Sequence, residues 1–437
     1  MARTVRVAVI GAGIGGLTAA AALHAQSFDV EVHERAAELA EVGAGLQLGP
    51  NAVKVLRALG LEDALKRLAC EPVNIVSLAW NTGSLRFREP LKAVAAAQFA
   101  APYLTVHRAD LHRLLCGKLA DNAVRLAAHC TGVATHGGQA VATFADGSTI
   151  EADVIIGADG INSVARECLL GPQPARYTRQ MAWRCLVPIA CVPTRVNGAA
   201  IGRDEYVGWI GPEGHVICYP IRQGETYNIF AGHVSEQWVD ESWVVPSSVA
   251  ELLAGFAGWN DALLTMLGHV EQCFKWGIRD RDPLPHWTCG RVTLLGDAAH
   301  PMMPTLAQGA AMALEDAFAV ARNLARHRDD LERGLQLYER ERLPRARAVQ
   351  LQARQQFQNN RKNPAPPPLS RDWIFAHDVT VDDPERAAAA DGHRRPGHPG
   401  LRQCLRYRRR PGEGQPLPGR RPDPARHLRS PHLDGDL

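Results

Sequence analysis

The chain has 437 residues, of which 46% are hydrophobic, and a formal net charge of +3. This length excludes a small disulfide-stapled fold and allows one large core or two connected cores. Much of the positive excess lies in the last fifty residues, so composition gives no case for nucleic-acid binding. The ten cysteines include no Cys-x-x-Cys pair, so no metal site is expected. No run of eighteen apolar residues or targeting segment is found, which favours a cytoplasmic protein without a membrane span.

The first residues predict a βαβ unit. Arg6–Ile10 is a short β-rich run, Ile14–Gln26 carries Ala and Leu at helical spacing, and Asp29–His33 is again typical of a strand. Two parallel strands require a crossover of this kind, so the chain is expected to begin with a parallel sheet.

A glycine fingerprint, Gly11-Ala-Gly13-Ile-Gly-Gly16, joins the first strand to the helix. Gly11 permits a tight turn, Gly13 lets a pyrophosphate approach the backbone, and Gly16 lets helix and sheet pack closely. Glu34 ends the next strand, where it can accept hydrogen bonds from ribose hydroxyls, and Arg35 beside it is a further cofactor-binding candidate. The motif predicts a dinucleotide site but does not choose between NAD and FAD.

Further elements follow along the chain. Helices are predicted at Pro50–Leu59 and Arg108–Leu115, and strands within Val73–Arg88 and Ala134–Ile156. From Arg179 to His233, short alternating apolar runs broken by Gly and Pro predict an antiparallel sheet with one face on a cavity.

Later segments return to the pattern of the first domain. Arg291–Leu295 is typical of a buried strand and Leu306–Arg326 of a strong helix, so a late part of the chain is expected to complete that domain. Beyond about Arg386 the composition changes to Arg, Pro, Gly and His, which cannot bury enough apolar surface to fold.

Two more motifs make the pattern specific. Asp153–Gly160 is an apolar strand ending in Ala-Asp-Gly, and Leu294–Pro301 is a strand ending in Gly296-Asp297. With the glycine fingerprint, these motifs resemble those of the FAD-dependent aromatic hydroxylases of the para-hydroxybenzoate hydroxylase type, and most closely the salicylate, 3-hydroxybenzoate and 6-hydroxynicotinate monooxygenases. The resemblance spans roughly residues 4 to 380, with further support from the segments Glu41–Pro50, His107–Leu111, Tyr219–Glu225 and Ala307–Asp316.

The resemblance implies an α/β fold with a Rossmann-like FAD-binding domain, an antiparallel-sheet substrate domain and C-terminal helices. The predicted division is an FAD-binding first part at 1–178 (with segments of the substrate domain near 73–104), a substrate-binding sheet at 179–280, the completion of the FAD domain with C-terminal helices at 281–385, and a basic, disordered tail at 386–437.

The resemblance also implies the reaction. FAD stays bound, NADH or NADPH docks transiently, and a flavin C4a-hydroperoxide formed with O2 hydroxylates a small aromatic acid, such as a hydroxybenzoate or hydroxynicotinate. The choice between NADH and NADPH, the substrate and the oligomeric state, for which a homodimer is one expectation, stay open.

Roles for individual cofactor residues follow from the same likeness. Asp297 is expected to bind the ribityl chain, Arg108 to lie near the diphosphate and ribityl region, and Asp159 to serve both FAD and the passing nicotinamide cofactor. Gly309 and Ala310 begin a long helix, whose positive end would stabilise the anion of reduced flavin.

Two residues of the substrate pocket are predicted from one strand. His215 and Tyr219 stand at i and i+4 of a strand-like run, hence on one face, and in similar hydroxylases a His and a Tyr at this spacing line the substrate pocket. We expect His215 to act as a base, directly or through Tyr219, with an imidazole pKa near 6.5.

Four further substrate contacts are predicted, namely Gln47, Arg184, Met303 and Thr305. Arg184 or Arg222 could meet a substrate carboxylate, although either could instead form a surface salt bridge. Some relatives carry a His or Gln shortly after His-Pro where this chain has Met303 and its neighbours, which leaves the hydroxylated ring position open.

Two alternatives remain at this stage. The same scaffold could carry a flavoprotein dehydrogenase, reductase or halogenase, because FAD motifs alone do not specify oxygen transfer. The chain could also be a catalytically impaired flavin-binding or regulatory protein. A yellow protein that bleaches with NADH would favour an enzyme.

Overall fold

The computed structural model describes residues 4–39, 44–236, 245–362 and 366–381. All of them belong to the first of two units of the chain, Met1–Gly397. The tail predicted for 386–437 lies outside the described residues, so its disorder stays a prediction. No helix in the described ranges combines the length and apolar character needed to cross a membrane.

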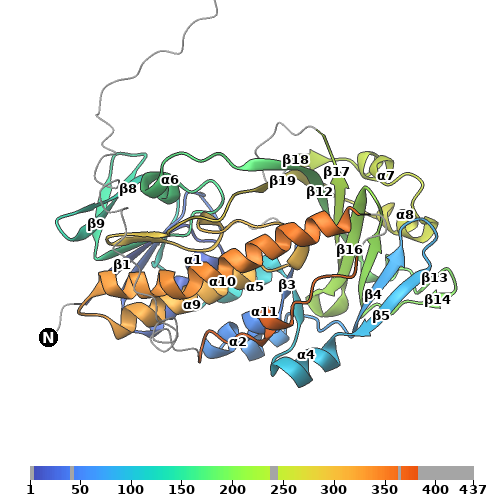
Figure 1. Ribbon diagram of the computed structural model, residues 1–437, viewed down its shortest axis with the longest axis horizontal. Helices are drawn as coiled ribbons and strands as arrows, with labels where there is room; N and C mark the ends of the chain where they lie inside the picture. The colour runs from blue at the N-terminus through green and yellow to red at the C-terminus, as the bar shows by residue number, and fades with distance from the viewer. Residues whose placement is uncertain (1–3, 40–43, 237–244, 363–365, 382–437) are drawn as a thin grey trace, which may run out of the picture. The chain divides into compact units, whose positions relative to one another are not determined.

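A six-stranded sheet gathers strands from both ends of this unit (Figure 1). All its neighbours are parallel except the first pair. In sheet order, the strands are β20 (Thr288–Cys289), β21 (Val292–Leu294), β11 (Val154–Gly157), β1 (Arg6–Ile10), β2 (Asp29–His33) and β7 (Val124–Arg125).

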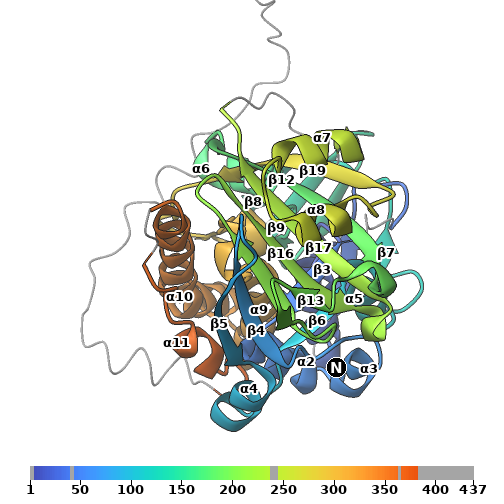
Figure 2. The same cartoon turned by 90° about the vertical axis from the view of Figure 1, so that its right-hand side faces the viewer.

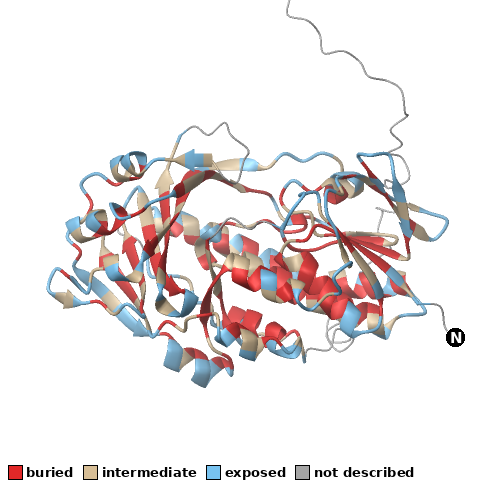
Figure 3. Ribbon diagram, turned by 180° about the vertical axis from the view of Figure 1, so that it is seen from behind, coloured by how far each residue is buried: buried red, intermediate tan, exposed pale blue. Residues whose placement is uncertain are grey.

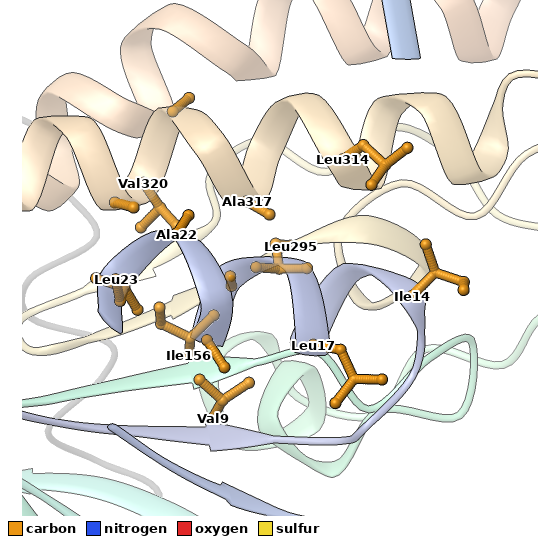
Figure 4. Close-up of a cluster of buried hydrophobic side chains, with 14 of the residues drawn as sticks. Val9, Ile14, Leu17, Ala22, Leu23, Ile156, Leu295, Leu314, Ala317 and Val320 are labelled. Atoms are coloured by element: carbon orange, nitrogen blue, oxygen red, sulfur yellow. The ribbon is translucent and has the colours of Figure 1, made fainter. Parts of the chain in front are cut away.

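Two helices cover one face of this sheet. In Figure 4, helix α1 (Ile14–Ala25) lies between the sheet and helix α9 (Gly309–Arg326), with Leu17 and Ile156 pointing into the same buried cluster. The small residues of α1, an alanine-rich helix, let it lie close to both neighbours. A three-stranded antiparallel sheet contributes to the same core: β8 (Cys130–His136), β9 (Gln139–Phe144) and β10 (Thr149–Ala152).

An eight-stranded sheet forms the other half of the unit. Its pairs are antiparallel except β15 and β4, which are parallel. In sheet order, the strands are β18 (Val245–Ser247), β19 (Cys273–Asp280), β12 (Arg176–Pro188), β17 (Thr226–Val234), β16 (Gly214–Ile221), β15 (Tyr206–Ile210), β4 (Asn74–Ala79) and β5 (Leu85–Pro90).

The two faces of this sheet meet different partners. Helices α7 (Val249–Gly255) and α8 (Asp261–Leu267) cover one face, as Figure 2 shows, and enclose an apolar core with it. A second cluster joins residues of α4 (Lys92–Phe99), α10 (Leu331–Asn360) and α11 (Asp372–Ala376) to strand β19. The apolar alternation in Arg179–His233 arises because successive side chains enter these two environments.

The remaining elements are short. They are the strands β3 (Gly45–Leu48), β6 (Leu104–His107), β13 (Arg195–Val196) and β14 (Ala199–Ala200), the α-helices α2 (Pro50–Ala58), α3 (Glu62–Lys66), α5 (Arg108–Cys116) and α6 (Val164–Leu170), and four 3-10 turns at Ile189–Cys191, Arg222–Gly224, Gly296–Ala298 and Pro304–Leu306.

The α/β fold class predicted from the sequence is confirmed, with parallel and antiparallel sheets and C-terminal helices. The helix predicted from Leu306 begins only at Gly309, because Pro304–Leu306 forms a 3-10 turn and Ala307 adopts a left-handed conformation, φ 54°. Buried residues concentrate on the parallel strands and their covering helices and on the inner strands of the second sheet (Figure 3). The domain boundaries stay a prediction.

Candidate active site

One cavity of about 1360 Å³ extends from the carboxyl ends of the parallel strands to one face of the eight-stranded sheet. It exceeds the roughly 300–1,000 Å³ typical of a pocket for one small molecule. Fifteen of the predicted site residues line it, namely Gly11, Gly13, Glu34, Arg35, Gln47, Arg108, Asp159, Arg184, His215, Tyr219, Asp297, Met303, Thr305, Gly309 and Ala310.

Three predicted residues do not line the cavity. Gly16 and Gly296 shape the backbone beside it, as described below. Arg222 is turned away from it, because its Nε lies 3.5 Å from Asp110 Oδ2 in an ion pair. Of the two carboxylate-binding arginines considered from the sequence, Arg222 is thus the salt-bridge partner.

The glycine fingerprint has the geometry that the sequence predicts. A Cβ on Gly16 would overlap the Gly11 carbonyl oxygen, so only glycine lets α1 approach β1 there. Gly13 is the N-cap of α1 and has no side-chain cap, and a Cβ on it would meet no atom within 4 Å. The first turn of α1 therefore presents unpaired backbone N–H groups to open space, a ready site for a phosphate.

Glu34 is fixed at the end of β2 by two backbone hydrogen bonds. Its Oε2 accepts from the N–H of Ala12 at 2.8 Å, and its Oε1 accepts from the N–H of Ala36 at 2.9 Å. Each carboxylate oxygen keeps a free lone pair, so the side chain can still accept from hydroxyl groups in the cavity.

Asp159 follows β11 and accepts hydrogen bonds from the start of helix α6, whose N-cap is Ser163. Its Oδ1 accepts from the Ser163 hydroxyl at 2.5 Å and its Oδ2 from the N–H of Ala165 at 3.1 Å. Desolvation by burial raises the pKa of Asp159 above its usual range despite these bonds. The carboxylate therefore has a structural role in addition to facing the cavity.

Asp297 faces the cavity from the turn that follows β21. Its side chain is exposed to that space, yet the surrounding protein still desolvates it and raises its pKa, with His300 and Arg108 opposing. Helix α9 begins beside it, since a Cβ on Gly309 would lie 3.9 Å from Asp297 Oδ1. The Asp297 carboxylate, a hydrogen-bond acceptor, and the positive N-terminal end of α9 therefore face the same part of the cavity.

The turn that carries Asp297 is held by buried charges. Oδ2 of Asp316 accepts from the N–H of Gly296 at 3.1 Å and lies 2.5 Å from His300 Nε2. Arg342 on α10 donates from Nε to Asp316 Oδ1 at 2.9 Å. The left-handed φ of Gly296, 60°, sets the direction of the turn.

His215 faces the cavity from β16 and is stacked on Phe230, with ring centroids 5.5 Å apart. Gly232 is its direct partner across the ladder, and a Cβ there would lie 2.8 Å from the imidazole Cε1. Desolvation by burial lowers the pKa of His215 to about 4. The sequence-based value near 6.5 is therefore wrong, and the imidazole is neutral at neutral pH.

Tyr219 shares this face of β16, whereas Val216 and Cys218 between the two belong to the opposite core. Its ring stacks on Tyr206 at 6.1 Å, and burial raises the pKa of its hydroxyl above the usual value of 10. Tyr219 stays protonated and can donate a hydrogen bond.

Gln47 connects Tyr219 to a second tyrosine. The Tyr103 hydroxyl donates to Gln47 Oε1 at 2.7 Å, and Gln47 is also hydrogen-bonded to Tyr219. Because its oxygen serves Tyr103, the amide N–H of Gln47 faces Tyr219, so the Tyr219 proton is available to the cavity.

The other predicted substrate residues border the same compartment. The Arg184 guanidinium lies 3.7 Å from the centroid of the Trp276 ring. Met303 is buried and apolar. The Thr305 hydroxyl donates to the Ala353 carbonyl at 2.6 Å, so its proton already has a partner.

Sequence reasoning missed several residues of this compartment, among them Tyr103, Tyr206, Phe230, Trp276 and Arg371. Phe230 and Trp276 could have been found from the period-two alternation of their strands. Nothing in the local sequence of Arg371 indicates a site, because it reaches the cavity through the packing of a C-terminal segment.

The fold and the cavity define a dinucleotide-binding protein with an aromatic-lined second compartment. The FAD binding domain family model matches residues 4–353. The chain is 38% identical over 392 residues to 6-hydroxynicotinate 3-monooxygenase of Bordetella bronchiseptica, covering 88% of this chain and 99% of that protein. It is 40% identical over 350 residues to 3-amino-4-hydroxybenzoate 2-monooxygenase PtmB3 of Streptomyces platensis, covering 80% and 87%.

A solved salicylate hydroxylase substrate complex shares the fold, with a TM-score of 0.75, 29% identity, and 88% and 98% of the two chains covered. The chain belongs to the family of FAD-dependent aromatic hydroxylases. It is accordingly an FAD-dependent monooxygenase that takes its electrons from NAD(P)H, as the sequence analysis expected. The alternatives of a dehydrogenase, reductase, halogenase or impaired flavin-binding protein lose their support.

Proposed function

We propose that this enzyme hydroxylates a small aromatic acid that carries a ring hydroxyl, such as a hydroxynicotinate or hydroxybenzoate. One observation carries the proposal: a single cavity joins the phosphate-binding turn of α1 to a compartment with His215, Tyr219 and aromatic walls. The relatives named for 6-hydroxynicotinate and 3-amino-4-hydroxybenzoate support this substrate class. At a ring carbon that carries hydrogen, the overall change is aromatic C–H plus O2, NAD(P)H and a proton to aromatic C–OH, water and NAD(P)⁺. At a ring carbon that carries the carboxylate, such as C3 of a nicotinate, the same oxidation takes up a second proton, and the carboxylate leaves as CO2.

The parallel-sheet end of the cavity fits FAD. We propose that the first turn of α1 at Gly13 holds the diphosphate with Arg108, and that Glu34, with Arg35 beside it, meets the adenosine ribose. Asp297 would accept from ribityl hydroxyls, and the start of α9 at Gly309 and Ala310 would favour negative charge on the reduced ring. The free volume at Gly13 supports this fit. When bound, FAD accepts the hydride of NAD(P)H and activates O2.

At the other end, His215 and Tyr219 are proposed to orient and polarise the substrate. The neutral His215 imidazole can accept the hydrogen bond of the ring hydroxyl, and takes up its proton only as the ring reacts. Tyr219 donates its free proton to the substrate, because Gln47 already serves its oxygen. Arg184, Met303 and the Trp276 face are proposed to hold the ring, and the enclosing aromatic side chains to exclude water.

The test is a panel of 6-hydroxynicotinate, 3-hydroxybenzoate, 4-hydroxybenzoate and salicylate. For each acid, NADH and NADPH oxidation is measured together with hydroxylated product and hydrogen peroxide. We expect at least one acid to give product in near-stoichiometric ratio to oxidised nicotinamide. Stimulated oxidation that yields only peroxide with every acid would contradict the proposed substrate class.

We also propose an oligomeric state and a cellular location for this enzyme. A homodimer would be seen by sedimentation as a doubled mass, and a cytoplasmic location by fractionation of the cells that make the enzyme. Both stay predictions.

A further inference from the structure

The substrate compartment contains a cation that the roles above do not use. Arg371 lines the cavity, and it stands on the segment that leads into helix α11. Its guanidinium carbon lies 5.1 Å from the Phe375 ring centroid and 5.9 Å from that of Tyr103. Among the described residues, no Asp or Glu lies within ion-pair distance of it, whereas Arg345 and Arg354 nearby in the sequence each pair with a carboxylate.

Arg371 is connected to the residues that face the substrate. It is hydrogen-bonded to Tyr103, whose hydroxyl donates to Gln47, which in turn contacts Tyr219. A guanidinium has five N–H donors and one tyrosine hydroxyl accepts few of them. Several N–H donors of Arg371 therefore remain for a ligand. Only Tyr103 and Gln47 stand between Arg371 and Tyr219 in this hydrogen-bonded chain.

The segment that carries Arg371 is anchored by contacts with two helices, α2 and α10. Lys54 Nζ, on α2, donates to the carbonyl oxygens of Phe375 and Ala376 at 3.2 and 3.1 Å. Arg345 Nη2, on α10, donates to the Ile374 carbonyl at 2.9 Å. A Cβ on Gly49, the N-cap of α2, would lie 2.6 Å from the Phe375 ring, so the start of α2 and α11 lie in direct contact. Because the backbone at Arg371 is already fixed, its side chain loses little further conformational entropy when it binds an anion.

We propose that Arg371 is the specificity-determining residue that binds the carboxylate of the substrate. The inference rests on the proposed function, since it assigns one group of that substrate. Arg184 is the competing cation, but the face of its guanidinium is already stacked on Trp276 at 3.7 Å. Arg371 also lies beyond residue 353, where the family match ends, so it can differ between enzymes that share the FAD motifs.

The test compares Arg371→Gln with a matched control, Arg361→Gln. Arg361 stands at the end of α10, and its guanidinium carbon also lies near a phenylalanine ring, 5.6 Å from the centroid of Phe357. Binding of 6-hydroxynicotinate and 3-hydroxybenzoate is measured by perturbation of the flavin spectrum, and KM by product formation. The corresponding amides, which keep the ring hydroxyl but lack the charge, serve as neutral probes.

Loss of a charge-assisted, bidentate contact should raise Kd and KM for the acids roughly 10- to 100-fold in Arg371→Gln. The amides should change by less than about threefold, Arg371→Lys should recover part of the affinity, and Arg361→Gln should match wild type.

Three results would overturn the assignment of Arg371 without touching the proposed substrate class. Two of them are wild-type affinity for the acids in Arg371→Gln, and loss of acid-over-amide preference in Arg184→Gln but not in Arg371→Gln. Equal losses for acids and amides would also overturn it, because they would indicate a structural role. If wild-type enzyme binds neither acid, the proposed substrate class fails first, and that outcome is visible before any variant is made.

Discussion

The two ends of the cavity are built in different ways. At the end of the parallel sheet, the groups that face the cavity are backbone N–H groups at helix starts and short acids that follow strands, as at Gly13, Glu34 and Asp297. At the other end they are large side chains from segments distant in sequence, such as Tyr103 just before β6, His215 on β16 and Trp276 on β19. We expect the first end to bind the cofactor that the family shares and the second end to select the substrate.

The difference predicts which changes are tolerated. Backbone contacts cannot be removed by side-chain truncation but are blocked by added bulk, whereas the aromatic end loses function when side chains are shortened. The four predictions that follow use this contrast, from the largest effect to the smallest.

Gly13→Leu should abolish FAD retention, because the added side chain would fill the free space that we assign to the diphosphate. A Cβ at this position meets no protein atom within 4 Å, so the fold should survive, with a circular dichroism spectrum like that of wild type. Gly16→Leu is the contrasting variant, expected to misfold because the side chain would overlap the Gly11 carbonyl. A Gly13→Leu protein that keeps bound FAD would contradict the assignment of this turn.

His215→Ala should keep FAD, since the turn that we assign to the diphosphate follows β1, which belongs to another sheet than β16. Product formation should fall by roughly a hundredfold as the proton acceptor is lost. NADH consumption should fall less, with more hydrogen peroxide per NADH. His269→Ala, which removes an exposed imidazole that does not line the cavity, is the control. Unchanged coupling and product rate in His215→Ala would show that another residue accepts the proton.

The pH dependence should reveal how deeply His215 is buried. Its pKa of about 4 in the folded protein lies below the ordinary value of 6.5. The ratio of product rates of wild type and His215→Ala should therefore stay constant from pH 8 to 6 and fall only below about pH 5. Between pH 6.5 and 4 the unfolded chain binds the proton first, so wild type should lose stability relative to His215→Ala as the pH falls. An inflection of the rate ratio near pH 6.5 would mean that the imidazole is solvated.

Deletion of the chain after Ala390 should have the smallest effect. The described contacts of the C-terminal segment end near Val381, whose N–H donates to the Asp378 carbonyl at 3.2 Å. FAD content and Tm should both stay close to the full-length values, as differential scanning fluorimetry and flavin absorbance would show. Loss of flavin on truncation would mean that the tail packs onto the remainder of the chain.

The two ends also differ in how far the sequence predicts them. The turn after β1, the acid after β2 and the Gly-Asp turn are local motifs whose spacing along the chain sets their geometry, so Gly13, Glu34 and Asp297 all face the cavity as expected. Period-two alternation likewise placed His215 and Tyr219 on one face of a strand.

The remaining features depend on contacts that no local pattern encodes. The pKa of His215 is lowered by burial on a sheet face beside Phe230, fifteen positions along the chain. Arg222 pairs with Asp110 across more than a hundred residues. Arg371 reaches the cavity because Lys54 holds the end of α11, a contact that becomes evident only once the chain has folded.

The interleaving of the two large sheets has a consequence for the order in which the polypeptide matures on the ribosome. β1 pairs with β11, β11 with β21, and β15 with β4, so partners are separated by more than a hundred residues in each case. The parallel sheet cannot be completed until residue 294 has emerged, and the sheet that begins with β4 waits for β19. Such distant pairings close slowly and expose unpaired strand edges during synthesis. Fragments cut at a domain boundary should therefore aggregate, and the dinucleotide can assist only the last steps of assembly.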